Sequence, residues 1–155
     1  MAGEVDARLA DLGIDVPDAA APVANYVGYV QTGNLVFVSG QVPIKDGQFQ
    51  YQGKLGESMS LEDAQAAARL CAINIIAQVK AACGGDLDRV TRIVKLTGFV
   101  NSTGDFTDQP KVVNGASDLM VEVFADKGRH SRAAVSAAAL PVGVSVEVEA
   151  VVEIA

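Results

Sequence analysis

The stretch RAAVSAAALPVGVSVEVEAVVEIA, residues 132–155, decides how this chain folds. Almost all of its residues are small or β-branched, which favours strands over helices. From residue 144 onward, apolar and polar side chains alternate with the period of a strand that buries one face. The pattern predicts two strands, 132–139 and 144–153, which residues 140–143 join as a closing β-hairpin.

Two charged residues in this stretch lie among small apolar neighbours. Arg132 opens the first predicted strand, and Glu147 lies inside the second. A guanidinium and a carboxylate on neighbouring strands can converge on a small anionic ligand, and the chain is then organised around presenting this pair. The residue pattern is equally compatible with two solvated strand charges.

The N-terminal half predicts a short helix and a β-hairpin. Residues 4–12 carry apolar side chains at helical spacing, and a proline-containing linker follows them. Runs 26–31 and 35–39 are rich in β-forming residues, and the intervening Thr-Gly-Asn is typical of a tight turn. Residues 44–51 contain Asp-Gly and predict a further short turn and strand.

The C-terminal half predicts two helices separated by a strand. Ser60 and Asp63 resemble a capping box for a long apolar helix that Gly84 and Gly85 end. Residues 90–100 alternate as a strand, and a second helix runs from Pro110 to Gly128. The sum is a single α+β domain, residues 1–155, with two helices packed on one face of a mixed sheet. Self-association is the expected cover for the other face.

Composition narrows the function classes. The net charge of −7 disfavours a nucleic-acid partner, because affinity for phosphates depends on clustered Lys and Arg. The acidic N-terminus does not resemble a signal peptide, and no segment is long and charge-free enough to span a bilayer, so a cytoplasmic location is expected. Cys71 and Cys83 are too far apart on one helix for a disulfide, which predicts buried thiols.

Common catalytic motifs do not account for the chain. It has no G-x-S-x-G and no phosphate-binding glycine loop, and a single histidine, His130, rules out a multi-histidine metal site. His130 is expected at a pocket rim or on the surface. The remaining polar side chains on strand-like stretches are Arg132, Glu147 and Tyr26. An arginine can bind a carboxylate, a glutamate can activate water, and a tyrosine can hold a second polar group.

Three segments resemble a known family. They are Tyr26 followed by GNLVFVSGQVP, the segment DRVTRIVKLTGFVNSTGDF, and above all SRAAVSAAALPVGVSVEVEAV. Together they resemble the RidA/YjgF family of reactive-intermediate deaminases, also described as endoribonuclease L-PSP-like. The resemblance implies a chorismate-mutase-like α+β fold in a homotrimer with clefts between subunits. Residues 1–22 are then an N-terminal extension.

The resemblance also implies residue roles. Arg132 matches the arginine that binds the substrate carboxylate, and Glu147 matches the glutamate that holds the attacking water. Tyr26 matches the tyrosine that lines the cleft, and Ser39 and Gly40 match the S-G-Q turn. The implied reaction hydrolyses a 2-imino acid to a 2-oxo acid and ammonia, without a metal or organic cofactor.

Two positions depart from the family pattern. Ala134 stands where many deaminating members carry cysteine, and Gly104 stands where they carry asparagine before the second helix. With His130, these positions complete the expected substrate-binding set. The departures motivate an alternative, a non-catalytic protein that binds a small carboxylate metabolite in the same clefts. Ribonuclease activity is a third possibility, which the acidic charge and the single histidine disfavour.

Overall fold

A computed structural model describes residues 3–155 of the chain. Its helices and strands follow one another in the order α1 (Glu4–Asp11), β1 (Tyr29–Thr32), β2 (Leu35–Gln41), β3 (Ile44–Lys45), β4 (Gln48–Phe49), α2 (Leu61–Ala82), β5 (Val90–Asn101), α3 (Gln109–Phe124), β6 (Ser131–Ala137) and β7 (Val146–Ile154). The predicted turn between residues 31 and 35 joins β1 and β2, and β3 and β4 form a short second hairpin.

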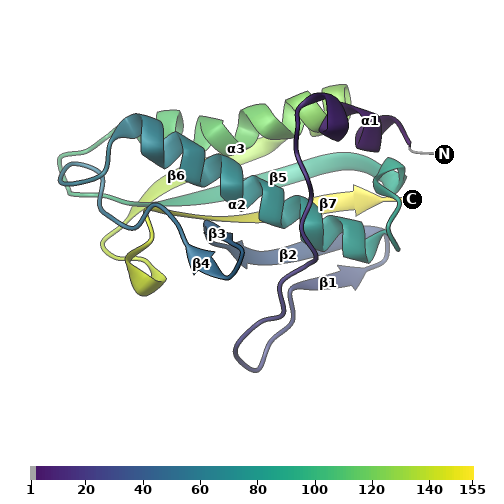
Figure 1. Ribbon diagram of the computed structural model, residues 1–155, viewed down its shortest axis with the longest axis horizontal. Coiled ribbons are helices and arrows are strands. Elements are labelled where there is room, and N and C mark those ends of the chain that lie inside the picture. Colours follow the sequence, from purple (N-terminus) through teal and green to yellow (C-terminus); the bar gives the residue numbers. More distant parts are fainter. Residues whose placement is uncertain (1–2) are drawn as a thin grey trace.

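The main sheet has five strands in the order β1-β2-β7-β5-β6, with α2 and α3 side by side across one face (Figure 1). Only β5 and β6 are parallel, because α3 forms the crossover between them. The predicted mixed α+β fold with two helices on one face is therefore confirmed.

The predicted C-terminal hairpin is wrong. β6 does not pair with β7; it lies parallel to β5 at the edge of the sheet, and β7 runs between β2 and β5. The crossover through α3 places β6 next to the strand that precedes the helix. β7 buries Val146, Val148 and Val152 on the helix-covered face, and its central position lets it form hydrogen bonds along both edges.

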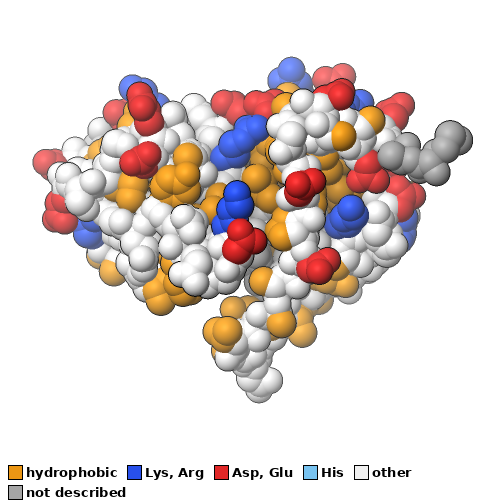
Figure 2. Space-filling view, in the orientation of Figure 1, with side chains coloured by type: hydrophobic (Ala, Val, Ile, Leu, Met, Phe, Trp, Pro, Cys, Tyr) orange, Lys and Arg blue, Asp and Glu red, His pale blue; other side chains and the backbone are white. Residues whose placement is uncertain are grey.

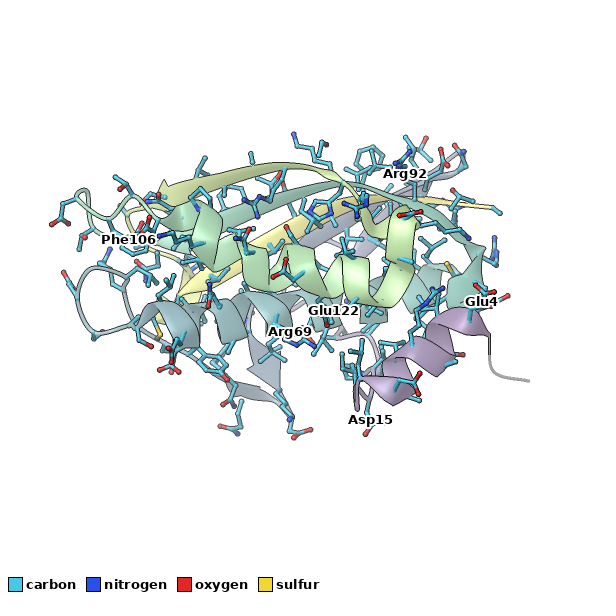
Figure 3. The ribbon with its side chains drawn as sticks, turned by 90° about the horizontal axis from the view of Figure 1, so that it is seen from above. Glu4, Asp15, Arg69, Arg92, Phe106 and Glu122 are labelled. Carbon is cyan, nitrogen blue, oxygen red and sulfur yellow. The ribbon has the colours of Figure 1, made fainter. Side chains whose placement is uncertain are left out.

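The core lies between the sheet and the two helices. The predicted apolar stripe of α3 is buried throughout, and α2 is anchored by Ser60, whose Oγ accepts a hydrogen bond from the Asp63 amide. The helices approach closely at Gly115, where an added Cβ would lie 2.1 Å from the carbonyl oxygen of Gln65. Nearer the C-terminal end of α3, Glu122 of this helix forms an ion pair with Arg69 of α2 at 3.2 Å (Figure 3).

Helix α1 packs on the body as expected. Two backbone amides of its first turn, those of Glu4 and Val5, donate to the carboxylate of Asp88, each at 3.0 Å. Arg8 adds a side-chain hydrogen bond to the carbonyl oxygen of Val123 in α3. An aspartate distant in the sequence therefore caps the helix and fixes its position.

Two predicted boundaries move. The first strand begins at Tyr29 rather than Tyr26, because residues 23–28 are irregular and mostly bent before the sheet starts. Helix α3 ends at Phe124, and a 3-10 turn over Ala125–Gly128 replaces the last predicted helical turn. Neither a proline nor a glycine lies at the end of α3. The helix ends where Ala125 adopts a positive φ of 54°.

The face of the sheet opposite the helices is partly apolar. Val30, Phe37 and Val135 are each between 44% and 53% exposed on it. Arg92, Lys95 and three glutamates of β7 share this face.

Both cysteines are free and buried, as predicted. Within residues 3–155, the structure has no helix with the length and hydrophobicity needed to cross a membrane.

Candidate functional site

Arg132 lies on the edge strand β6, on the helix-covered side of the sheet. Its Cα pairs with that of Leu96, whose side chain is in the core. The guanidinium reaches α3, where Nη1 donates to Asn114 Oδ1 at 2.8 Å and to Ser117 Oγ at 3.2 Å. Its Nε and Nη2 donate to no residue that the structure describes, and no carboxylate among those residues lies within 4 Å. The charge is therefore oriented by neutral groups and keeps donors available for an anion.

The contact between Arg132 and Ser117 continues to His130. The Ser117 Oγ lies 2.8 Å from His130 Nε2, and His130 Nδ1 lies 2.7 Å from the carbonyl oxygen of Gly128. A carbonyl oxygen only accepts, so Nδ1 carries the proton and, in the neutral ring, Nε2 accepts from Ser117. His130 is half-buried at the rim of this cluster, where it holds Ser117 in place.

Glu147 lies on β7 and faces the other side of the sheet. Its Cα pairs with that of Phe99, one residue out of phase with the core positions. The register between β2 and β7 shifts between Val38 and Gln41, and the carboxylate lies over Gly40, where an added Cβ would be 2.3 Å from Oε1. Burial, with a smaller contribution from Glu149, raises the pKa of Glu147. A glycine at position 40 is what leaves room for this carboxylate.

One subunit does not bring Arg132 and Glu147 together. β5 lies between their strands, and the two side chains project from opposite faces of the sheet. At about 4.8 Å per strand and about 3.3 Å per residue, they are separated by about 10 Å across the sheet and about 10 Å along it. The sequence suggested a pair on neighbouring strands, and the strand order overturns that arrangement.

Ser39 anchors the segment that carries Tyr26. Its Oγ donates to the carbonyl oxygen of Val27 at 2.7 Å, and its amide donates to Gly28 at 2.9 Å. Tyr26 itself is 54% exposed, just before β1. Ser39, Gly40 and Glu147 therefore belong to one neighbourhood at the β2–β7 irregularity, and Tyr26 is tethered near it by Val27.

The remaining predicted positions lie elsewhere. Ala134 is on the same face of β6 as Arg132 and packs against the core, whereas Gly104 lies in an exposed loop. The asparagine that contacts Arg132 is Asn114 in the second turn of α3, which the sequence reasoning missed. Asn114 and Ser117 are three residues apart, and this helical spacing on the polar side of an apolar stripe was the available indication.

No metal site accompanies these residues. Among residues 3–155, the His, Cys, Asp and Glu side chains form no group of three that could hold a metal ion. The two clusters instead offer a guanidinium with available donors and a half-buried carboxylate of raised pKa. They suit a ligand with a carboxylate and a reaction that uses water.

Comparisons with known proteins show the family of this chain and agree with its fold. Residues 6–154 match the family model described as "YjgF/chorismate_mutase-like, putative endoribonuclease". Protein TCP17 of Trypanosoma cruzi is 52% identical, with 98% of this chain and 95% of that protein covered. The RutC family protein y4sK of Sinorhizobium fredii is 33% identical over 91% of this chain and 96% of its own length.

Solved structures also show the same fold over most of this chain. Atu1372 of Agrobacterium tumefaciens, whose function is described as unknown, has a TM-score of 0.92 at 48% identity, with 97% of this chain and 92% of that chain covered. E. coli TdcF with bound serine has a TM-score of 0.65 at 27% identity, with 88% and 94% covered. On the match to the family model and the similarity to y4sK and TCP17, the chain belongs to the RidA/YjgF family.

Proposed function

We propose that the protein hydrolyses reactive 2-imino acids, the tautomers of enamines, to 2-oxo acids and ammonia. The observation that carries the proposal is the Arg132 guanidinium, which neutral side chains hold in place while Nε and Nη2 stay available. A planar guanidinium of this kind matches a carboxylate in charge and shape. TdcF, a structural neighbour, was solved with bound serine, which also carries a carboxylate.

Glu147 supplies the water chemistry. Water adds to the electrophilic carbon of the protonated imine, and the carboxylate accepts a proton from that water as the carbon–oxygen bond forms. Glu147 then returns that proton to the amino nitrogen of the tetrahedral adduct, and the carbon–nitrogen bond breaks with ammonia as the leaving group. As the carbonyl of the 2-oxo acid forms, the hydroxyl proton passes to the released ammonia, which leaves as ammonium. A raised pKa makes the ionised Glu147 a stronger base than an ordinary glutamate, which suits this role.

The two residues act on one molecule if they come from different subunits. Within one chain, β5 and the sheet itself separate them. Arg132 is on an edge strand, and the partly apolar face that bears Phe37 and Val135 is suited to association with another copy. We therefore place the site in clefts between the subunits of a homotrimer, with Tyr26 and Ser39 contributing to the Glu147 side.

The test couples the full-length protein to an enzyme that releases 2-imino acids and follows 2-oxo acid formation. Arg132→Ala is expected to lower kcat/KM about 30-fold to several-thousand-fold, since losing such an anchor removes about 2–5 kcal/mol. Arg129→Ala is the matched control, because this exposed arginine is three residues away and pairs only with Asp126 among the described residues. Wild-type rates in Arg132→Ala, or no acceleration by the wild type, would contradict the proposal.

Ala134 favours one alternative, a non-catalytic protein that binds small carboxylates in the same place. The methyl side chain beside Arg132 offers no proton-transfer group. In that case 2-oxo acids raise the melting temperature through Arg132, but the coupled assay shows no turnover. RNA hydrolysis is disfavoured by the net charge of −7.

A further inference from the structure

A separate cavity of about 650 Å³ lies on the helix side of the molecule. The segment 13–20 after α1, the turn between β3 and β4, and one side of α2 enclose it. Figure 2 shows hydrophobic side chains in the depression between the N-terminal segment and the β3–β4 turn, with acidic side chains along the N-terminal segment. Its volume falls within the range of about 300–1,000 Å³ typical of small-molecule sites.

The floor of the cavity is apolar. Leu70 and Ile73 of α2 lie in the pattern that predicts core positions, yet both remain partly exposed because they face the cavity. Ile14 and Val16 approach from the N-terminal segment, and Ile44 from β3. A ligand with an aliphatic or aromatic body would remove this surface from water.

Asn74 presents an open hydrogen-bond acceptor in the same wall. Its side chain is 7% exposed, and Nδ2 donates to the carbonyl oxygens of Val42 at 3.0 Å and Ile44 at 3.1 Å. Both amide hydrogens are thereby used. Oδ1 receives no hydrogen bond from the part of the chain that the structure describes, so it is the atom that Asn74 can offer to a ligand in the cavity. A carbonyl oxygen selects for an N–H or O–H donor.

The rim selects the charge of that donor. Asp15, Asp18 and Asp46 line the cavity, and Lys45 is the one basic residue among its lining residues. None of these four side chains forms a salt bridge with residues 3–155. The excess of carboxylates lowers the free energy of a cation bound there and raises that of an anion.

We propose that this cavity binds a small apolar molecule that carries a protonated primary amine. The apolar body packs on Leu70 and Ile73, and the ammonium donates to Asn74 Oδ1 while the rim carboxylates compensate its charge. The site shares no lining residue with the clusters around Arg132 and Glu147, and it selects the opposite charge from Arg132. It therefore does not depend on the proposed deaminase activity.

The test titrates the full-length protein, labelled with ¹⁵N, with 2-phenylethylamine and with two analogues of similar shape, 2-phenylethanol and 3-phenylpropionate. The amine is expected to shift the amide resonances of residues 14–16, 18, 44–47 and 70–74, with the alcohol at least about tenfold weaker, which corresponds to one charge-assisted hydrogen bond. The carboxylate is expected not to shift these resonances.

Variants locate the interaction. Asp15→Asn/Asp18→Asn is expected to weaken amine binding about tenfold, whereas the control Asp11→Asn/Glu57→Gln changes the net charge equally at exposed residues outside the cavity. Leu70→Trp, which fills the cavity, is expected to abolish binding without lowering the melting temperature. Equal binding of amine and alcohol, shifts that map to other residues, or equal weakening by both double variants would overturn the proposal.

Discussion

Arg132 and Glu147 differ in how their charges are held. Arg132 is held by the neutral side chains of Asn114 and Ser117, so its positive charge stays available to a ligand. Glu147 is half-buried over Gly40 without a basic partner among the described residues, and burial raises its pKa. Neither side chain is neutralised by an opposite charge among the described residues, as expected of residues proposed to act on a substrate.

The raised pKa of Glu147 predicts a pH dependence. Because the base must be ionised, kcat/KM is expected to fall at acid pH along a limb centred above the ordinary value of 4.5. Glu149→Gln removes the neighbouring like charge, so its limb is expected at lower pH with activity retained, whereas Glu147→Gln loses about two orders of magnitude in rate. A pH–rate profile of the three proteins checks this, and an unchanged limb in Glu147→Gln would assign it to another group.

The same pKa shift predicts the sign of a stability effect. The folded state binds this proton more tightly than the unfolded state, so the contribution of Glu147 to stability is present below pH 4.5 and is lost as pH rises through the raised pKa. Glu147→Gln is therefore expected to melt at a higher temperature than the wild type at pH 7, and the difference should vanish below pH 4.5. Thermal melts at both pH values measure it.

At the scale of elements, the contact between α2 and α3 depends on Gly115. Alanine would favour the helix by about 0.8–1.0 kcal/mol, but its Cβ would meet the Gln65 carbonyl oxygen at 2.1 Å. Overpacking against backbone typically costs about 1–3 kcal/mol, so Gly115→Ala is expected to lower the free energy of unfolding in urea. Asp118→Ala, exposed on the same helix, should change the free energy of unfolding by less than about 0.5 kcal/mol. A stabilised Gly115→Ala would contradict the prediction, because it would show that α2 and α3 can move apart at this contact without cost.

Helix α1 depends on Asp88 for its place on the body. The Val5 and Glu4 amides lower the pKa of this carboxyl, so the docking is at full strength above its ordinary value of 3.8 and weakens as pH falls below it. Asp88→Ala is expected to speed hydrogen exchange throughout α1 while α2 and α3 keep their protection. Asp118→Ala, which removes an exposed carboxylate from α3 instead, should leave α1 protected. Equal protection of α1 in both variants would place its anchorage in its other contacts, the buried Val5 and Leu9 and the Arg8 hydrogen bond.

At the scale of the whole molecule, the sheet separates the two halves of the proposed site. Opposite faces and an intervening strand keep Arg132 from Glu147 within one chain. The side that bears Arg132 also carries the helices, whereas Glu147 shares its face with Phe37, Val135 and other partly exposed residues. Association of copies through that face is the arrangement that can unite them.

Subunit mixing tests this arrangement. Arg132→Ala and Glu147→Gln are each expected to keep only a small fraction of the wild-type activity alone. After they are unfolded and refolded together in equal amounts, about a quarter of the sites should combine an intact Arg132 with an intact Glu147 from a neighbour, and about a quarter of the wild-type activity should return. Separately refolded and then combined proteins are the control. No recovery in a mixed trimer, verified by native mass spectrometry, would place both residues of a site in one subunit.

Sequence periodicity determined the elements of this protein. Alternation in residues 144–153, the apolar stripe of α3 and the turn at residues 32–34 are local patterns, and backbone geometry converts each into a strand, a helix or a turn. The resemblance carried by the segments around Tyr26, Arg132 and Glu147 also indicated the family that the comparisons then showed.

Tertiary structure alone decided how those elements meet. Strand order depends on which edges find partners across long stretches of chain, so β7 lies between β2 and β5 although β6 precedes it in the sequence. That order puts Arg132 and Glu147 on opposite faces and gives Arg132 its partner Asn114. Leu70 follows a core pattern, yet it lines a cavity because the N-terminal segment and the β3–β4 turn do not close over it. Periodicity records which side chains avoid water, and only the packing of distant segments decides what each of them touches.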